Sequence, residues 1–304
     1  MTKLRRNHEK ASGGLAIKTG LFLTLMGLLY GAFQFFEKGA PKKPESRVVI
    51  NVPSDDDEPS SPGGDLLLPS VKHGELVSHE YYTLSYDEKN EQAEWVTYFI
   101  SKKRLNNKKA DRTDWFEKDP LVKSGSATFK DYKGSGYDKG HLAPAADMAF
   151  SEKAMEDCFY MSNMSPQVHS FNGGIWRELE ELARDWGRMN NKLYVVTGPI
   201  FKDNLGTIGR ANKVTVPGYY YKVLLDIEGP EKKGIGFIIP NAVSNQPLTA
   251  YVKTIDEVEE MTGIDFFPVL DDDLEEKLES HVNLAKWKFN QNLYKVRTEK
   301  WNIR

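Results

Sequence analysis

Cysteine is almost absent from this chain of 304 residues, in which Cys158 is the only one. A single cysteine excludes an intramolecular disulfide and a zinc site built from several thiolates. Cys158 stands between Asp157 and Phe159, where we expect a buried structural thiol rather than a redox group. A location outside the cytoplasm stays open, because extracytoplasmic proteins can fold without disulfides.

An excess of positive charge is also missing, since 41 basic residues face 44 acidic ones and the formal net charge is −3. A protein that coats nucleic acid relies on many phosphate contacts from Lys and Arg, so this mode of binding is excluded. Residues 101–123, however, hold eight Lys or Arg against four Asp or Glu, a local net charge of +4. Any contact with nucleic acid is expected near this segment, although a solvated face would also explain its lysines.

One long apolar run extends from Leu15 to Phe36 and approaches the roughly 20 residues that a membrane-spanning helix needs. Residues 1–14 form a basic tail, so the positive-inside rule places the N-terminus in the cytoplasm and the rest of the chain on the other side. A cleaved signal peptide is the alternative, but the end of the run lacks the small residues of a cleavage site. We therefore expect a single-pass membrane anchor with the main domain in the periplasm or outside the cell.

The remainder of the chain divides by composition. Residues 37–74 are rich in Pro, Ser, Gly and acid and are expected to form a disordered linker, because they cannot bury enough apolar surface. Calcium binding by its acidic run is disfavoured, since ligand-spaced Asp residues and a turn glycine are missing. Residues 75–281 form the expected domain, followed by a basic and aromatic C-terminal extension at 282–304. A packed or loose extension is favoured there over a nucleic-acid-binding arm.

The domain has a mixed secondary-structure pattern. Apolar residues recur every three or four positions in residues 174–189, with similar patterns at 248–262 and 272–281, and this spacing predicts three helices. Strands are expected where β-branched and aromatic residues are bounded by turn formers, at residues 93–101, 192–197, 219–226 and 234–240. Helices and strands together predict an α+β fold.

Three closely spaced segments carry most of the functional information: YDKGHLAPAADM at 137–148, MSNMSPQ at 161–167 and FNGGIWRELE at 171–180. As an ordered set they resemble the DNA/RNA non-specific endonuclease family of the ββα-metal nucleases, and the resemblance covers about residues 74–280. It implies a central antiparallel sheet with flanking helices, and a β-hairpin bearing His141 that packs on the helix bearing Asn172. The activity it implies is endonucleolytic cleavage of DNA and RNA with little sequence preference, leaving 5′-phosphate ends.

Phosphodiester hydrolysis needs the groups that these segments offer. An attacking water must lose a proton near neutral pH, and an imidazole with a pKa of about 6.5 suits that task, so His141 is the expected general base. A hard cation, Mg²⁺ or Mn²⁺, must neutralise charge on the phosphate, and the resemblance makes Asn172 its single direct protein ligand. Glu180 lies eight residues further along the predicted helix and is expected to hold the ion through water.

The resemblance also assigns roles around the phosphate. Arg112 matches an arginine that contacts phosphate and stabilises its developing charge. Lys139 stands where the family usually has Arg, which keeps the positive charge but gives up bidentate geometry. Asn163 matches a residue that supports the site, by hydrogen bonding near His141 or the phosphate. His169 is interpreted as a surface-loop residue, because the resemblance gives it no role.

Two neighbours of the histidine invite structural interpretations. Asp138 is expected to fix the loop or to pair with a cation, and Gly140 to permit a close backbone approach.

Two other functions stay open: hydrolysis of small nucleotide phosphodiesters, and a membrane-tethered nucleic-acid-binding module with weak turnover, the latter motivated by Lys139. The sequence leaves the oligomeric state undetermined, a homodimer included.

Overall fold

A computed structural model describes residues 67–302 of the chain. The expected basic tail, membrane anchor and most of the linker, residues 1–66, lie outside the described residues. Within residues 67–302, none of the helices combines the length and the apolar character that a membrane span requires.

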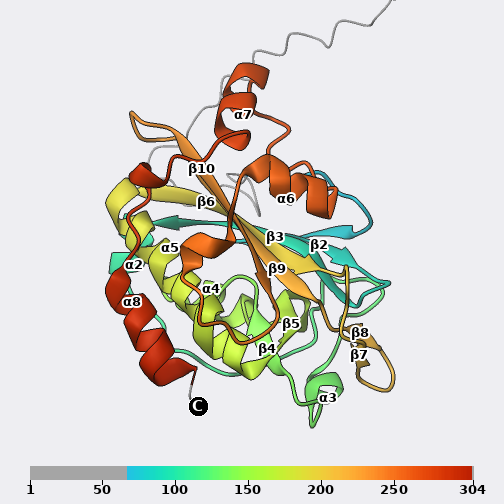
Figure 1. The fold of residues 1–304 in the computed structure, drawn as a ribbon. Helices are drawn as coiled ribbons and strands as arrows, with labels where there is room; N and C mark the ends of the chain where they lie inside the picture. The colour runs from blue at the N-terminus through green and yellow to red at the C-terminus, as the bar shows by residue number, and fades with distance from the viewer. Residues whose placement is uncertain (1–66, 303–304) are drawn as a thin grey trace, which may run out of the picture. The chain divides into compact units, whose positions relative to one another are not determined.

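A seven-stranded sheet forms the centre of the domain, with every neighbouring pair antiparallel (Figure 1). Its order is β1-β2-β3-β6-β9-β10-β11. All four expected strands are confirmed as β3, β6, β9 and β10, because their side chains are apolar on both faces and pack between two layers. The strands are β1 (Glu75–Ser78), β2 (Thr83–Asp87), β3 (Gln92–Ser101), β6 (Lys192–Ile200), β9 (Tyr219–Asp226), β10 (Lys233–Pro240) and β11 (Val252–Lys253).

Two hydrophobic cores lie on opposite faces of this sheet. Side chains alternate along a strand, so Val195 and Leu224 belong to one core while Val196 and Val223 belong to the other. The first core joins the sheet to α5 (Arg177–Asn190), and the second joins it to α6 (Ile255–Thr262) and α7 (Asp272–Glu279). Figure 1 shows α5 on one side of the sheet and α6 on the other. The predicted α+β class with a central antiparallel sheet and flanking helices is confirmed.

A second, two-stranded sheet lies on the α5 side. Its strands are β4 (Asp138–His141) and β5 (Met164–Gln167), which pair antiparallel with His141 opposite Met164. The intervening residues include α4 (Glu152–Asp157) and η1 (Met161–Asn163), so the two strands of this antiparallel ribbon are joined by a long connection and not by a short turn. After β5 the chain enters η2 (Phe171–Trp176) and then α5. The ribbon and the helix form a ββα unit.

The expected helices differ from the structure at their beginnings. The helix expected at 174–189 is preceded by the π-helical turn η2 and a break at Gly174, whose φ of −105° and ψ of −111° are not helical. The helix expected at 248–262 begins only at Ile255, because Val252 pairs with Phe237 in the sheet and Thr254 caps α6 through a capping box with Glu257. The helix expected at 272–281 ends at Glu279.

Both ends of the described chain pack on the domain. Leu67 is buried and its carbonyl accepts from Thr97 Oγ1 at 3.3 Å, while the carbonyl of Ser70 accepts from Trp95 Nε1 at 3.1 Å. Residues upstream of the expected domain start at 75 are therefore part of the packed domain. At the other end, Trp287 is buried against Trp186 of α5, with ring centroids 4.8 Å apart, so the extension up to residue 302 is packed and not loose.

The remaining elements are short. They are α2 (Lys102–Asn106), α3 (Phe129–Tyr132), β7 (Thr207–Ile208), β8 (Val214–Thr215), η3 (Leu248–Tyr251), η4 (Leu284–Lys286), α8 (Gln291–Val296) and η5 (Arg297–Trp301).

Candidate active site

His141 ends strand β4, and the backbone beside it approaches β5 closely. A Cβ atom on Gly140 would lie 2.1 Å from the side chain of Gln167, so any other residue here would have to displace that buried side chain. The close approach expected of Gly140 is therefore present. Gly140 pairs with Ser165, which fixes the register between β4 and β5. Because side chains alternate along a strand, the His141 side chain lies on the face of this two-stranded sheet opposite that of residue 140.

The imidazole of His141 is buried in an aromatic setting. Its ring contacts Phe159 edge-on at a centroid distance of 4.7 Å and Phe116 at 6.0 Å, and only 8% of the residue is exposed. Its Nε2 atom is buried and has no hydrogen-bond partner within the protein. Burial, followed by the positive charges of Arg112 and Lys139, lowers the pKa of His141 to about 3. The imidazole is therefore neutral at pH 7, the form in which one of its two ring nitrogens carries no proton.

Two cations flank this histidine. Lys139 is half-buried, and its Nζ lies 4.8 Å from the ring centroid of Phe116 and 4.7 Å from that of Phe129. Arg112 comes from an irregular segment and places its guanidinium 5.1 Å from the ring centroid of Phe159. Its side chain is 54% exposed and Nε donates to Asp114 Oδ1 at 2.7 Å, so most of its hydrogen-bonding capacity faces solvent. The structure thus brings Arg112, Lys139 and His141 into one electropositive site.

Asn163 is fully buried and bonds only to backbone. Its Oδ1 accepts from the N–H of Ala143 at 2.9 Å, and its Nδ2 donates to the carbonyls of Ala143 at 3.0 Å and Cys158 at 2.8 Å. The backbone N–H of Leu142 also donates to the Asn163 carbonyl at 3.0 Å. Asn163 therefore holds the turn that follows His141, and its amide is too enclosed to contact a substrate.

Asn172 lies in η2, and its amide is oriented by Asp138. The Asp138 Oδ2 atom accepts from Asn172 Nδ2 at 2.9 Å and lies 2.9 Å from Nδ1 of the exposed His169. An ionised carboxylate can only accept, so the Asn172 NH₂ group must face Asp138 and its carbonyl oxygen must face away. Asp138 thus contacts the amide of Asn172 and the imidazole of His169, and His169 lies on the surface with a contact that sequence reasoning missed.

The π-helical turn separates Asn172 from α5. The break at Gly174 means that the 100° per residue of an α-helix cannot be counted from Asn172 to Glu180, which is why the predicted angle between them does not apply. Asn302 supports this turn, since a Cβ on Gly174 would lie 2.7 Å from Asn302 Oδ1. The C-terminal segment therefore contacts the element that carries Asn172.

Glu180 projects from α5 into a buried ionic cluster. Its pKa is raised to about 7 by burial, against the opposing effects of Lys222 and Arg184. Lys222 of β9 is completely buried, its Nζ has no hydrogen-bond partner, and burial lowers its pKa to about 8. Arg184 Nη1 donates to Asp147 Oδ1 at 2.9 Å, so the negative charge of Asp147 is paired with the guanidinium. Burial of Glu180 thus favours its neutral form, whereas Lys222 and Arg184 favour its carboxylate.

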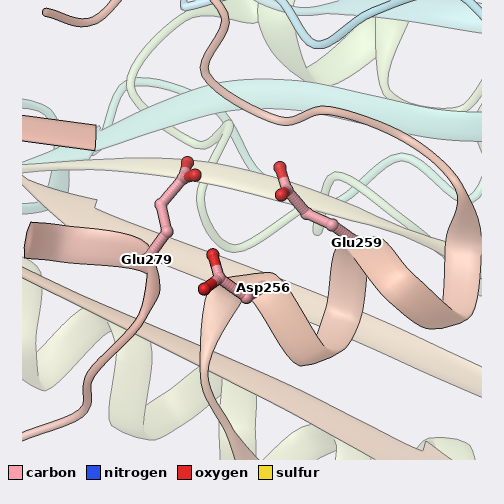
Figure 2. A group of neighbouring side chains, drawn as sticks. All are labelled: Asp256, Glu259 and Glu279. Carbon is pink, nitrogen blue, oxygen red and sulfur yellow. The ribbon is translucent and has the colours of Figure 1, made fainter. Parts of the chain in front are cut away.

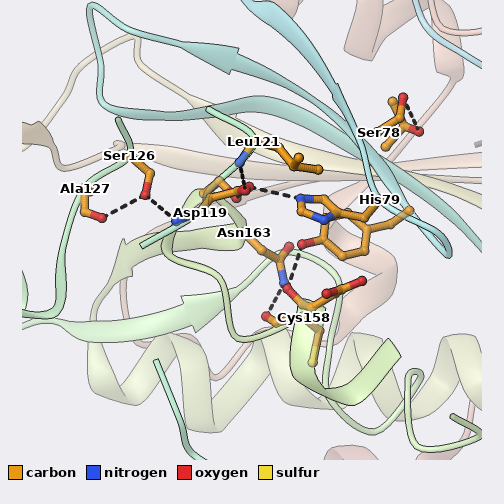
Figure 3. A network of polar contacts seen from close by, with 12 residues as sticks. Ser78, His79, Asp119, Leu121, Ser126, Ala127, Cys158 and Asn163 are labelled. Carbon is orange, nitrogen blue, oxygen red and sulfur yellow. Dashed lines mark hydrogen bonds and ion pairs between the residues drawn. The ribbon is translucent and has the colours of Figure 1, made fainter. Parts of the chain in front are cut away.

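A second buried histidine lies behind the turn of Asn163 (Figure 3). His79 Nε2 donates to Asp119 Oδ2 at 3.0 Å, and its ring stacks on Tyr82 and Tyr160 at centroid distances of 4.6 and 5.2 Å. Burial opposes ionisation of Asp119, but hydrogen bonds from His79, Ser162 and the Leu121 backbone lower its pKa overall. Because Ser162 precedes Asn163, this network ties the η1 turn to the loop after β1.

An open pocket of about 410 Å³ lies next to Arg112 in sequence. Trp115 is 70% exposed, an unusual position for so large an apolar side chain. A platform of this kind suits a flat, unsaturated ligand group. The pocket is lined by Thr113, Trp115, Glu117, Glu156 and Tyr160.

Sequence reasoning selected Arg112, Lys139, His141, Asn163 and Asn172, and the structure gathers them around the ββα unit. Sequence reasoning missed the hydrogen bond between Asp138 and Asn172. It also missed Lys222 and Arg184 beside Glu180, because their positions depend on contacts between distant elements. A charged residue inside an otherwise apolar strand was the one available signal for Lys222.

This arrangement, in which a His-bearing ribbon packs with an Asn-bearing helix, is that of the ββα-metal nuclease fold. The chain belongs to the DNA/RNA non-specific endonuclease family, whose sequence profile matches residues 67–273. It is an endonuclease, and its family acts on both DNA and RNA without sequence specificity.

Known relatives agree with this assignment. Human mitochondrial endonuclease G is 36% identical over 207 residues, which cover 64% of this chain and 70% of that protein. Nuclease C1 of Cunninghamella echinulata is 36% identical over 214 residues, covering 65% of this chain and 84% of the relative. The crystal structure of the EndoG/EndoGI complex, described as showing the mechanism of EndoG inhibition, matches with a TM-score of 0.61 and 30% identity. That match covers 67% of this chain and 89% of the other.

Proposed function

We propose that this endonuclease hydrolyses DNA and RNA phosphodiesters with His141 as the general base, leaving 5′-phosphate ends. The observation that carries the proposal is the buried, unpartnered Nε2 of a neutral imidazole beside two cations. An Nε2 atom without an internal partner accepts the proton of a water that attacks the phosphorus. Arrival of a negatively charged phosphate raises the basicity of His141, because it offsets the charges of Arg112 and Lys139.

Arg112 and Lys139 would bind the phosphate. Arg112 has free donors that face solvent and fits two phosphate oxygens at once, whereas the Lys139 ammonium provides a single point charge. Charge that develops on the phosphate oxygens is stabilised by both. Contacts of this kind address the backbone and not the bases, which accounts for cleavage with little sequence preference.

A divalent cation, Mg²⁺ or Mn²⁺, is the proposed cofactor. Asn172 fits the role of direct ligand, because Asp138 occupies its NH₂ group and leaves the hard carbonyl oxygen for a cation. Glu180 would act through water on the hydrated ion, and Asp138 holds Asn172 in place. The ion supplies positive charge to the phosphate and to the leaving 3′-oxygen.

The anchor expected at residues 15–36 lies outside the described residues and remains part of the proposal. With a cytoplasmic N-terminus it would tether the nuclease on the far side of a membrane, where the substrates are extracytoplasmic DNA and RNA. Protease added to intact cells should then digest the nuclease domain, and protection of the domain from external protease would contradict this placement.

Cleavage of plasmid DNA and RNA tests the proposed chemistry. We expect the full-length protein to degrade both with Mg²⁺ or Mn²⁺ and to be inactive with EDTA. His141→Ala should lower the rate by roughly 10²–10⁴-fold, the usual contribution of a positioned base. His281→Ala, at an exposed histidine, is the matched control and should be unaffected. Equal rates for the two variants would refute the assignment of the base.

A further inference from the structure

The negative charge of the chain is concentrated in one place. Residues 255–279, which span α6 and α7, contain eleven Asp or Glu and a single Lys. Because the whole chain has a net charge of only −3, the remainder is net positive. The α6–α7 segment packs on the second core, on the sheet face opposite α5 and the candidate active site. A surface of this charge repels nucleic acid and attracts cations.

Three carboxylates of this segment converge on one point. Asp256 and Glu259 lie one turn apart on α6, and Glu279 ends α7 opposite them (Figure 2). One oxygen from each lies within 4.8 Å of the others. Glu259 Oε1 accepts from the N–H of Phe266 at 2.7 Å, which fixes its carboxylate.

Glu279 gives independent evidence that a ligand is required. The residue is only 4% exposed, and its Oε1 atom is buried with no hydrogen-bond partner within the protein. A buried, unpaired carboxylate oxygen is costly unless a cation or proton satisfies it. Figure 2 shows the carboxylate of Glu279 beside those of Glu259 and Asp256, so the oxygen without a partner belongs to this cluster of acids.

Neighbouring carboxylates add to the cost of a charged Glu279 and Glu259. Burial and then the carboxylates of Glu259, Glu275, Asp256 and Asp265 raise the pKa of Glu279 to about 8. Burial likewise raises the pKa of Glu259 to about 7, against the opposing hydrogen bond from the Phe266 N–H and with further contributions from Asp265 and Asp256. The neighbouring carboxylates therefore repel one another, and one bound cation would relieve this repulsion at both residues.

The ligand type and spacing favour calcium. Ca²⁺ accepts several carboxylates at about 2.3–2.6 Å, so two oxygens on opposite sides of it are up to about 5 Å apart. Mg²⁺ holds its ligands at about 2.0–2.1 Å and keeps most of its waters, so it spans only about 4 Å. The three carboxylate oxygens lie within 4.8 Å of one another, which is inside the span of Ca²⁺. Asp256 is exposed, which provides an entry path and room for water ligands.

We propose that Asp256, Glu259 and Glu279 form a structural Ca²⁺ site that joins α6 to α7. It is separate from the nuclease centre, and its occupation stabilises the domain without taking part in cleavage.

The test measures the melting temperature of the full-length, EDTA-treated protein with and without CaCl₂, and counts bound ions by calorimetry. Asn172→Ala serves as the background, so that Ca²⁺ bound at the nuclease centre does not enter the count. In that background we expect one bound Ca²⁺ and a rise of roughly 5–10 °C at a hundredfold excess over Kd. MgCl₂ at the same concentration should give a smaller rise.

Three further variants locate the site. Glu279→Gln keeps the size of the side chain and should abolish both the bound ion and the calcium-dependent rise. Asp256→Asn changes an exposed residue, so it cannot disturb the core, and should weaken binding at least tenfold. Glu260→Gln, an exposed glutamate on the same helix outside the cluster, is the matched control and should behave as the background.

Two results would overturn the proposal. One is a background protein that neither binds Ca²⁺ nor melts at a higher temperature in its presence, which would mean that protons alone satisfy the cluster. The other is a Glu279→Gln protein whose calcium response equals that of Glu260→Gln. Cleavage of plasmid with Mg²⁺ should be the same for Glu279→Gln and the native sequence, so failure of the calcium site leaves the nuclease assignment standing.

Discussion

Replacing His141 with asparagine should remove a large part of the acid sensitivity of the fold. The pKa of His141 is about 3 in the folded protein, whereas an unfolded chain has about 6.5. Folding lowers the pKa, so the unfolded state binds more protons between these values. The stabilisation from the neutral imidazole is therefore complete above pH 6.5 and is lost as the pH falls. Between pH 7 and pH 4 the loss amounts to about 3 kcal/mol.

Urea denaturation at pH 7, 5.5 and 4 measures this loss in metal-free protein. Buried carboxyls such as Glu180 and Glu279 also titrate, with the opposite sign, but they do so in both proteins and cancel in the difference. The native protein should lose about 3 kcal/mol more than His141→Asn, while His281→Asn should follow the native protein. Equal losses in native protein and His141→Asn would refute the conclusion that folding buries a neutral imidazole at this position.

Three other changes test neighbouring features. Lys222→Met removes a charge that lowers the pKa of Glu180, so the acid limb of the kcat/KM profile should move to higher pH; an unmoved limb would separate Glu180 from catalysis. Arg297→Met leaves Glu178 buried without its partner and should lower the free energy of unfolding by about 3–5 kcal/mol in urea; a loss below about 1 kcal/mol would show that the contact is dispensable. Trp115→Ala should raise KM roughly 5- to 150-fold at nearly constant kcat if a base stacks there, and an unchanged KM would exclude that platform.

The sheet could be predicted from the sequence because its central strands are buried on both faces. Segments such as 192–197 and 219–226 are rich in β-branched and aromatic residues and lie between turn formers, and this local pattern is sufficient. The start of α5 could not be predicted, because apolar spacing does not distinguish a π-helical turn from an α-helical one. The packing of the C-terminal extension depends on Trp186 and Trp287, which are far apart in sequence.

The same distinction holds for the candidate site. His141, Asn163 and Asn172 lie in short ordered segments, so their resemblance to a family identified them. The partners that determine their behaviour come from elsewhere: Phe116 and Phe159 enclose His141, and no sequence rule predicts a pKa that depends on such an enclosure. The acidic cluster on α6 and α7 was likewise invisible, because its members become neighbours only when the two helices pack together.

Chemical rescue tests the central claim, that His141 Nε2 accepts the proton of the attacking water. His141→Gly should cleave plasmid DNA at least about a hundredfold more slowly than the native enzyme with Mg²⁺. Added imidazole should restore part of the rate in proportion to its neutral form, and it should not restore Asn172→Gly. A His141→Gly enzyme that keeps more than about a tenth of the native rate without imidazole would contradict the assignment of His141 as the general base.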